Sequence, residues 1–185
     1  MFYLGIDPSF TRTGIAVVER QTGTYMLHAA TSISAPKFES DIYQIDVTLK
    51  ASHWLAAAIM QQVEEWCREF DITACCIEFP VLATESGAYL ALIQQALYEL
   101  YPRLSVPVYG VSANAIGSYT KTGNKARLVA WGLQNFKFNV PRLGRRGGFI
   151  NHDEYSGAVL AIIASLIDHK EYTHVCKTFY KPKTE

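Results

Sequence analysis

The chain begins with an apolar segment that ends on a carboxylate. Residues 2–6 read Phe-Tyr-Leu-Gly-Ile, which predicts a buried strand, and Asp7 follows directly. A carboxylate beside a buried strand is costly to remove from water unless another group pairs with it. Asp7 therefore constrains the fold, because a cation, hydrogen-bond donors or a metal ion must lie next to it.

Two more acidic positions stand at the ends of predicted apolar elements. A later apolar strand ends on Glu78, and Asp153 with Glu154 begins an apolar helix. Acids that are far apart in sequence and similarly placed suggest a site for a divalent metal ion, which prefers oxygen ligands. Each acid also has an ordinary alternative: Asp7 as a turn cap, Glu78 as a surface acid, and the pair at 153–154 as helix-capping residues.

The spacing of apolar residues predicts alternating strands and helices after an opening meander. The expected strands are 2–7, 13–20, 24–31, 72–78 and 106–111, and the expected helices are 44–70, 85–101, 125–136 and 153–168. This order predicts an α/β fold. Its mixed five-stranded sheet combines a three-strand antiparallel meander with two parallel strands, and helices cover both faces.

Length and composition predict one ordered domain over residues 1–185. The hydrophobic content is 49% and the charged content 18%, and no apolar segment has the length of a membrane span. The first residues lack the basic region and cleavage site of a signal peptide, so we expect a cytoplasmic protein without a membrane partner.

Positive charge is concentrated in one part of the chain, although the net charge is zero. Eight of the 17 basic residues and none of the 17 acidic ones lie between positions 100 and 152. Such asymmetry is typical of a face that binds a polyanion. The alternative is a surface segment that merely lacks acids.

Four motifs follow one another along the chain. They are Leu4-Gly5-Ile6-Asp7-Pro8-Ser9 with Thr13-Gly14-Ile15-Ala16, then Ile77-Glu78, then Lys121-Thr122-Gly123-Asn124-Lys125, then Asp153-Glu154-Tyr155-Ser156-Gly157-Ala158-Val159-Leu160-Ala161. In this order and at these spacings they resemble the RuvC family of Holliday junction resolvases, which have the RNase H-like fold.

The resemblance implies a single nuclease domain of RuvC type over 1–185. Its implied activity is metal-dependent endonucleolytic resolution of Holliday junctions or other branched DNA, in recombination and repair, by a homodimer. It implies two Mg²⁺ ions, with Mn²⁺ as a substitute, and two-metal phosphodiester hydrolysis. The implied ligands are Asp7, Glu78 and Asp153, and the implied catalytic cation is Lys125.

The last motif departs from the family at one position. Resolvases of this kind usually carry a second acid one helical turn after the first, where this chain has Ser156. Either three carboxylates suffice, or His152 or Glu154 substitutes for the missing acid. The alternative function is a catalytically weakened or inactive RuvC-fold module that binds DNA or serves a structural role.

Further positions are assigned to DNA binding by the same resemblance. They are Lys121, Lys125, Arg127, Arg142, Arg145, Arg146 and Phe79. The basic residues would contact phosphates, whereas Phe79 would wedge into a junction or, as the alternative, pack in the core. A weaker resemblance links Gly5-Ile6-Asp7 to the first phosphate loop of actin-like sugar kinases, which require two such domains.

Overall fold

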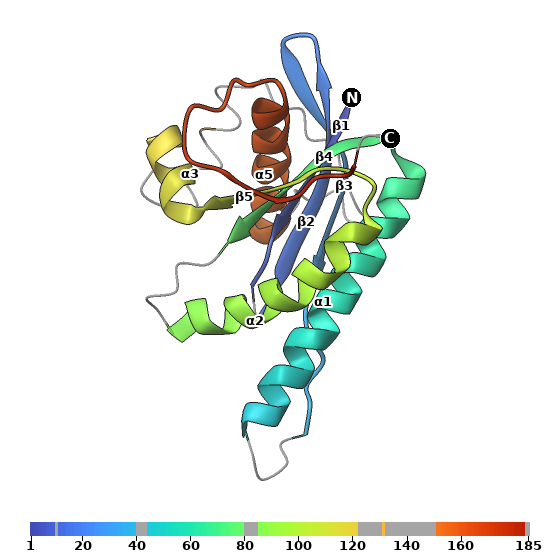
Figure 1. Cartoon of the computed structure of the whole chain (residues 1–185), viewed down its shortest axis with the longest axis vertical. Coiled ribbons are helices and arrows are strands. Elements are labelled where there is room, and N and C mark those ends of the chain that lie inside the picture. The colour runs from blue at the N-terminus through green and yellow to red at the C-terminus, as the bar shows by residue number, and fades with distance from the viewer. Residues whose placement is uncertain (10, 40–43, 80–84, 122–130, 132–150, 184–185) are drawn as a thin grey trace.

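One mixed sheet organises the computed structural model, which describes residues 1–9, 11–39, 44–79, 85–121, 131 and 151–183 (Figure 1). The strands are β1 (Phe2–Asp7), β2 (Thr13–Gln21), β3 (Thr24–Ile33), β4 (Ile72–Phe79), β5 (Val108–Ser112) and β6 (Lys177–Tyr180). The helices are α1 (Gln44–Glu69), α2 (Glu85–Leu100), α3 (Ala113–Thr120) and α5 (His152–Asp168), with a 3-10 turn at Tyr101–Arg103. The strand order across the sheet is β3-β2-β1-β4-β5-β6.

The strand pairing confirms the predicted mixed sheet. Strands β1, β2 and β3 form an antiparallel meander, whereas β1, β4 and β5 run parallel to one another. The parallel strands all end at the same edge of the sheet, so β1 and β4 deliver their last residues, Asp7 and Glu78-Phe79, to one place.

Two elements were not predicted from the sequence. Strand β6 adds a sixth strand, antiparallel to β5, and helix α3 follows β5 directly. Strand β6 has only four residues, two of them exposed, which is too short for a recognisable alternation. The helix predicted over 125–136 falls almost entirely outside the described residues.

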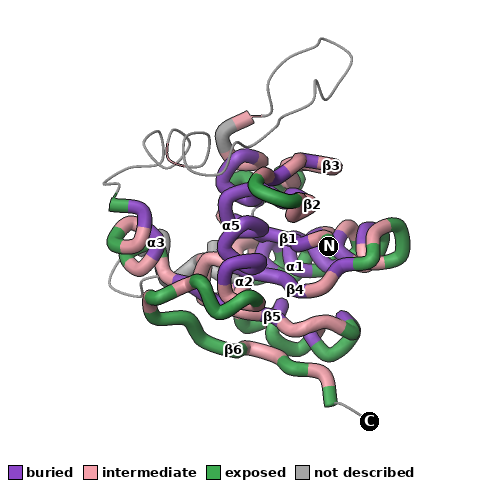
Figure 2. The backbone as a smooth tube through the Cα atoms, turned by 90° about the horizontal axis from the view of Figure 1, so that it is seen from above, coloured by how far each residue is buried: buried purple, intermediate pink, exposed green. Residues whose placement is uncertain are grey.

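The alternation of side chains along the strands divides the core into two layers. Along β1, Tyr3 packs with α5, whereas Leu4 and Ile6 pack with α1 and α2. Figure 2 shows that the buried segments run along α5 and the central strands, and the core on the opposite face takes its helical residues from α1 and α2. Helices therefore cover both faces of the sheet, as the sequence predicts.

Helix α5 lies with its backbone directly against the first two strands. A Cβ added at Gly5 of β1 would overlap the carbonyl oxygen of Gly157 and the backbone nitrogen of Ala161. A Cβ added at Gly14 of β2 would overlap the backbone of Asp153. Glycine is required at both positions because any side chain would push the helix away from the sheet.

Helix α5 is the most apolar of the described helices, which fits its burial. All residues from Tyr155 to Leu166 are buried, so the helix is covered on every side. Within the described ranges, no helix combines the length and the apolar character that crossing a membrane requires.

We predict that Gly5→Ala lowers the free energy of unfolding by about 3 kcal/mol, since overpacking against backbone cannot be relieved by a rotamer change. Chemical denaturation measures the effect. Gly23→Ala is the comparison: nothing lies within 4 Å of that site, and its φ of 74° gives a cost of about 1 kcal/mol. Equal effects of the two substitutions would show that the close contact with α5 is not a packing constraint.

Candidate active site

Asp7 is an acid held inside the fold. Its side chain is 3% exposed, and among the described residues it is the only Asp, Glu, Lys or Arg that is buried. Side chains alternate along β1, so Asp7 faces the α5 side together with Tyr3 and Gly5. Because burying a carboxylate is costly unless other groups compensate, the position of Asp7 makes it a candidate functional residue.

Glu78 lies beside Asp7 on the neighbouring strand. The parallel register pairs Ile6 with Ile77, which places the next residues, Asp7 and Glu78, side by side. Cys76 packs on the α5 side and Ile77 on the opposite side, so Glu78 returns to the α5 side. The sheet therefore presents two adjacent carboxylates on one face at its carboxyl-terminal edge.

Asp153 approaches the same corner from α5. Its backbone rests on Gly14, and Gly14 is the antiparallel partner of Asp7. The first turn of α5 thus sits one strand away from Asp7 because Gly14 has no side chain. The three acids expected to act together come from β1, β4 and α5 and gather around one end of one sheet face.

A capping box fixes the start of α5. The Oδ1 atom of Asn151 accepts hydrogen bonds from the backbone nitrogens of Asp153 at 3.0 Å and Glu154 at 2.9 Å. The Glu154 carboxylate in turn accepts from the Asn151 backbone nitrogen at 3.1 Å and from its Nδ2 at 2.9 Å. Asn151 Nδ2 also donates to Ser32 Oγ of β3 at 3.0 Å, which ties the cap to the sheet.

The candidates for the fourth ligand position differ in their surroundings. Glu154 has both carboxylate oxygens in the capping box, so its placement is that of a structural cap. Ser156 is 4% exposed and lies one turn after Asp153 on α5. The side chain of His152 is outside the described residues. Burial raises the pKa of the neighbouring Tyr155 to about 12, so its hydroxyl stays protonated at neutral pH.

Arg12 lies beside Asp153 and was not singled out from the sequence. Its Nη1 atom lies 3.9 Å from Oδ2 of Asp153, and the two side chains are 54% and 27% exposed. Arg12 directly precedes β2 and belongs to no periodic pattern, so nothing in the sequence marks it. It places a positive charge at the rim of the acidic corner.

The donor chemistry of this corner fits a hard divalent cation. Asp7, Glu78 and Asp153 offer carboxylate oxygens, which suit Mg²⁺ and Mn²⁺, and Ser156 offers a hydroxyl. In the part of the chain that the structure describes, however, no three His, Cys, Asp or Glu side chains are grouped closely enough to hold a metal ion. The backbone thus brings the acids to one corner, and their described side chains do not form a three-residue metal group.

Most of the expected DNA-binding residues cannot be placed. Lys125, Arg127, Arg142, Arg145 and Arg146 lie outside the described residues. Lys121 is exposed at the end of α3, where it has a φ of 54°.

Phe79 is half-buried and lies against strand β6. Its ring lies 5.9 Å from that of Phe179 on β6, and the Nζ atom of Lys177 is 5.1 Å from its centroid. The surroundings of Phe79 are therefore those of the packing alternative, although it follows Glu78 directly.

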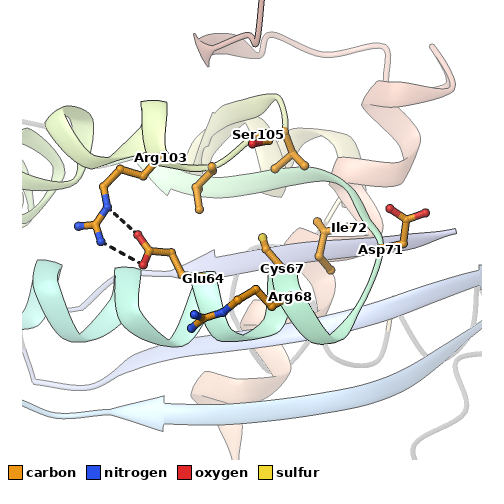
Figure 3. A pocket seen from close by; sticks show the side chains of 9 residues that line it. Glu64, Cys67, Arg68, Asp71, Ile72, Arg103 and Ser105 are labelled. Atoms are coloured by element: carbon orange, nitrogen blue, oxygen red, sulfur yellow. Dashed lines mark hydrogen bonds and ion pairs between the residues drawn. The ribbon is translucent and has the colours of Figure 1, made fainter.

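A groove lies at the opposite end of β4, far from the acids (Figure 3). Its volume is about 580 Å³, and it is lined by the end of α1, the start of β4 and the segment before β5. Arg103 spans it with an ion pair to Glu64, whose Nε to Oε1 distance is 2.7 Å. The lining mixes opposite charges and apolar side chains and includes none of the expected site residues.

Comparison with known proteins supports the fold and not a sequence family. No protein-family model matches the sequence, and no curated protein matches it. Among solved structures, RuvC of Thermus thermophilus superimposes with a TM-score of 0.67 at 13% identity, covering 96% of this chain and 99% of that chain.

Two further structures give similar coverage. T. thermophilus RuvC in complex with a Holliday junction substrate gives a TM-score of 0.63 at 14% identity, over 95% and 99% of the two chains. The human cytomegalovirus terminase nuclease domain gives 0.48 at 12% identity, over 92% and 84%. The RuvC structures show that this chain has the RNase H-like fold in its RuvC form, as its four motifs predict.

We predict that Asn151→Ala lowers the free energy of unfolding by about 1–2 kcal/mol, because two helix-start amides and Glu154 lose their partner. Ser32→Ala, which removes only the tie to β3, is expected to cost about 1 kcal/mol. Asn151→Ser retains a capping oxygen and should recover most of the loss. Thermal and chemical denaturation test the series. An Asn151→Ala variant with the free energy of unfolding of the wild type would contradict the role of the cap.

Proposed function

We propose that this protein is a metal-dependent endonuclease that cleaves branched DNA. The observation that carries the proposal is the position of Asp7, Glu78 and Asp153 at one corner of a RuvC-type fold. The burial of Asp7 supports the proposal as well, because an acid that is only 3% exposed is not an ordinary surface residue and is costly to bury.

The chain supplies the oxygen ligands for a divalent ion. Asp7 and Glu78 would hold it from the sheet and Asp153 from α5, with Mg²⁺ or Mn²⁺ suited to such ligands. When bound, two such ions supply an activated water and stabilise charge on the phosphodiester. Lys125 is proposed as a neighbouring cation that offsets negative charge on the phosphate.

The proposed substrate is a four-way junction or a related branch. One support is that a solved RuvC structure of this fold is in complex with a Holliday junction substrate. Another is the stretch from 100 to 152, which has eight basic residues and no acidic one. Residues of that stretch, with Lys121 at the end of α3, are proposed to bind phosphates without reading sequence.

A homodimer is the proposed assembly, since paired cuts across a four-armed junction need a two-fold arrangement. Helix α2 supports it: Tyr98 is 60% exposed there, and Leu90 and Leu92 are only half-buried. An exposed ring on an otherwise apolar helix suits an interface between two copies.

The second candidate is a DNA-binding module with weakened or absent catalysis. Two observations favour it: Ser156 replaces an acid, and the described side chains form no group of three metal-binding residues. It predicts salt-sensitive binding of branched DNA without metal-dependent nicking.

We predict that Asp7→Asn slows metal-dependent cleavage of a labelled four-way junction by about a thousandfold or more, since a metal ligand contributes several kcal/mol to the transition state. Junction binding in EDTA should persist. The assay compares wild type and variant in Mg²⁺, Mn²⁺ and EDTA, with a linear duplex alongside. Cleavage by Asp7→Asn at the wild-type rate would exclude this site. Binding without cleavage by the wild type would favour the second candidate.

We predict that Ser156→Asp destabilises the metal-free protein by about 2–4 kcal/mol, because it buries another carboxylate one helical turn after Asp153. Millimolar Mg²⁺ should then recover much of the loss, as a bound ion stabilises the native state. Ser156→Asn, with similar size and no charge, should not gain stability from Mg²⁺ beyond the wild type. The test is to record melting curves of each variant with and without Mg²⁺. If Mg²⁺ changed the melting temperature of both variants equally, position 156 would lie outside the site.

A further inference from the structure

Arg12 forms only a weak ion pair, and its partner, Asp153, is one of the three candidate metal ligands. The 3.9 Å separation from Asp153 exceeds hydrogen-bonding distance, and the guanidinium side chain is 54% exposed. An exposed ion pair at this distance stabilises little and breaks easily. Arg12 therefore lies near the acids, and its guanidinium can leave Asp153 for another anion at little cost.

The turn that carries Arg12 is internally bonded. The hydroxyl of the fully buried Thr13 accepts from the Ser9 backbone nitrogen at 3.3 Å and donates to the Ser9 carbonyl at 3.2 Å. Ser9 Oγ also lies 3.1 Å from Thr11 Oγ1. Because Asp7 ends β1 and Gly14 lies under α5, both ends of the turn are anchored, and Arg12 is presented at the rim of the acidic corner.

The negative charge of the acidic corner would hinder the binding of DNA, and Arg12 can counteract it. Three carboxylates repel a phosphodiester that must approach them, and a cation at the rim reduces that repulsion. Arginine suits the task because its guanidinium binds phosphate oxygens through two parallel hydrogen bonds. Its side chain is 54% exposed, so a phosphate in solvent can reach the guanidinium.

We infer that Arg12 binds a backbone phosphate of the nucleic acid at the edge of the active site, and exchanges its ion pair with Asp153 for that contact. The inference rests on the proposed function and adds a substrate-binding residue to it. It assigns the turn between β1 and β2 a role in holding DNA, besides supplying Asp7.

The test measures binding of a fluorescein-labelled four-way junction, and of a linear duplex, by anisotropy in EDTA over 50–300 mM salt. We expect Arg12→Ala to weaken binding of both DNAs about tenfold at low salt, and to reduce the slope of log affinity against log salt by about one. Arg12→Lys should retain the slope because it retains the charge.

Arg68→Ala is the matched control. Arg68 is an exposed arginine beside the groove at the opposite end of β4, so its removal changes the net charge equally at a remote position (Figure 3). We expect Arg68→Ala to keep the wild-type slope and affinity within about twofold. Melting temperatures of all variants establish that each is folded.

The outcomes separate the two ideas. A wild type that binds DNA, with Arg12→Ala indistinguishable from Arg68→Ala, overturns the role of Arg12 and leaves the proposed function standing. A folded wild type that binds neither DNA overturns the proposed function and the inference with it. A reduced slope for Arg12→Ala alone supports the inference, whether or not the protein cleaves.

Discussion

The contact between the backbone of α5 and the backbones of β1 and β2 is the constraint on which the candidate site depends. Gly5 and Gly14 leave no room for a side chain, and a Cβ at Gly157 would lie 3.1 Å from the Gly14 carbonyl oxygen. Backbones in contact cannot adjust as side chains do, so the helix has one position on the sheet. That position sets Asp153 beside the partner of Asp7, and the capping residue Asn151 holds the first turn there.

The same packing creates an electrostatic problem. Two carboxylates within about 4 Å of each other repel by roughly 4 kcal/mol at the effective dielectric constant of a protein surface. An exposed ion pair such as that of Arg12 with Asp153 returns about 1 kcal/mol at most. If the three side chains closed on one point, this ion pair would not offset their mutual repulsion, whereas a bound divalent cation would.

The sequence predicted the parts of this structure that follow from local pattern. The buried strand ending on Asp7, the meander, and the apolar helix after Asp153 all follow from periodicity and polarity, and these elements carry the acids. The sequence did not predict β6, whose four residues pair only because β5 offers a free edge, or Arg12, whose meaning comes from a residue 141 positions later. Likewise, nothing local to Gly14 indicates its tertiary role, which is to make room for α5. Contacts between distant segments leave no periodic signal in either segment.

Ser156 can be understood from the same balance of charge. The position is 4% exposed and lies one turn after Asp153, so a carboxylate there would be buried on the same face of α5. Each added buried acid raises the cost of the metal-free fold, because desolvation and like-charge repulsion both oppose ionisation. A serine keeps an oxygen at that turn without the charge. In the proposed site, a serine at this position lowers the repulsion that the metal-free fold must tolerate and leaves three carboxylates to hold an ion.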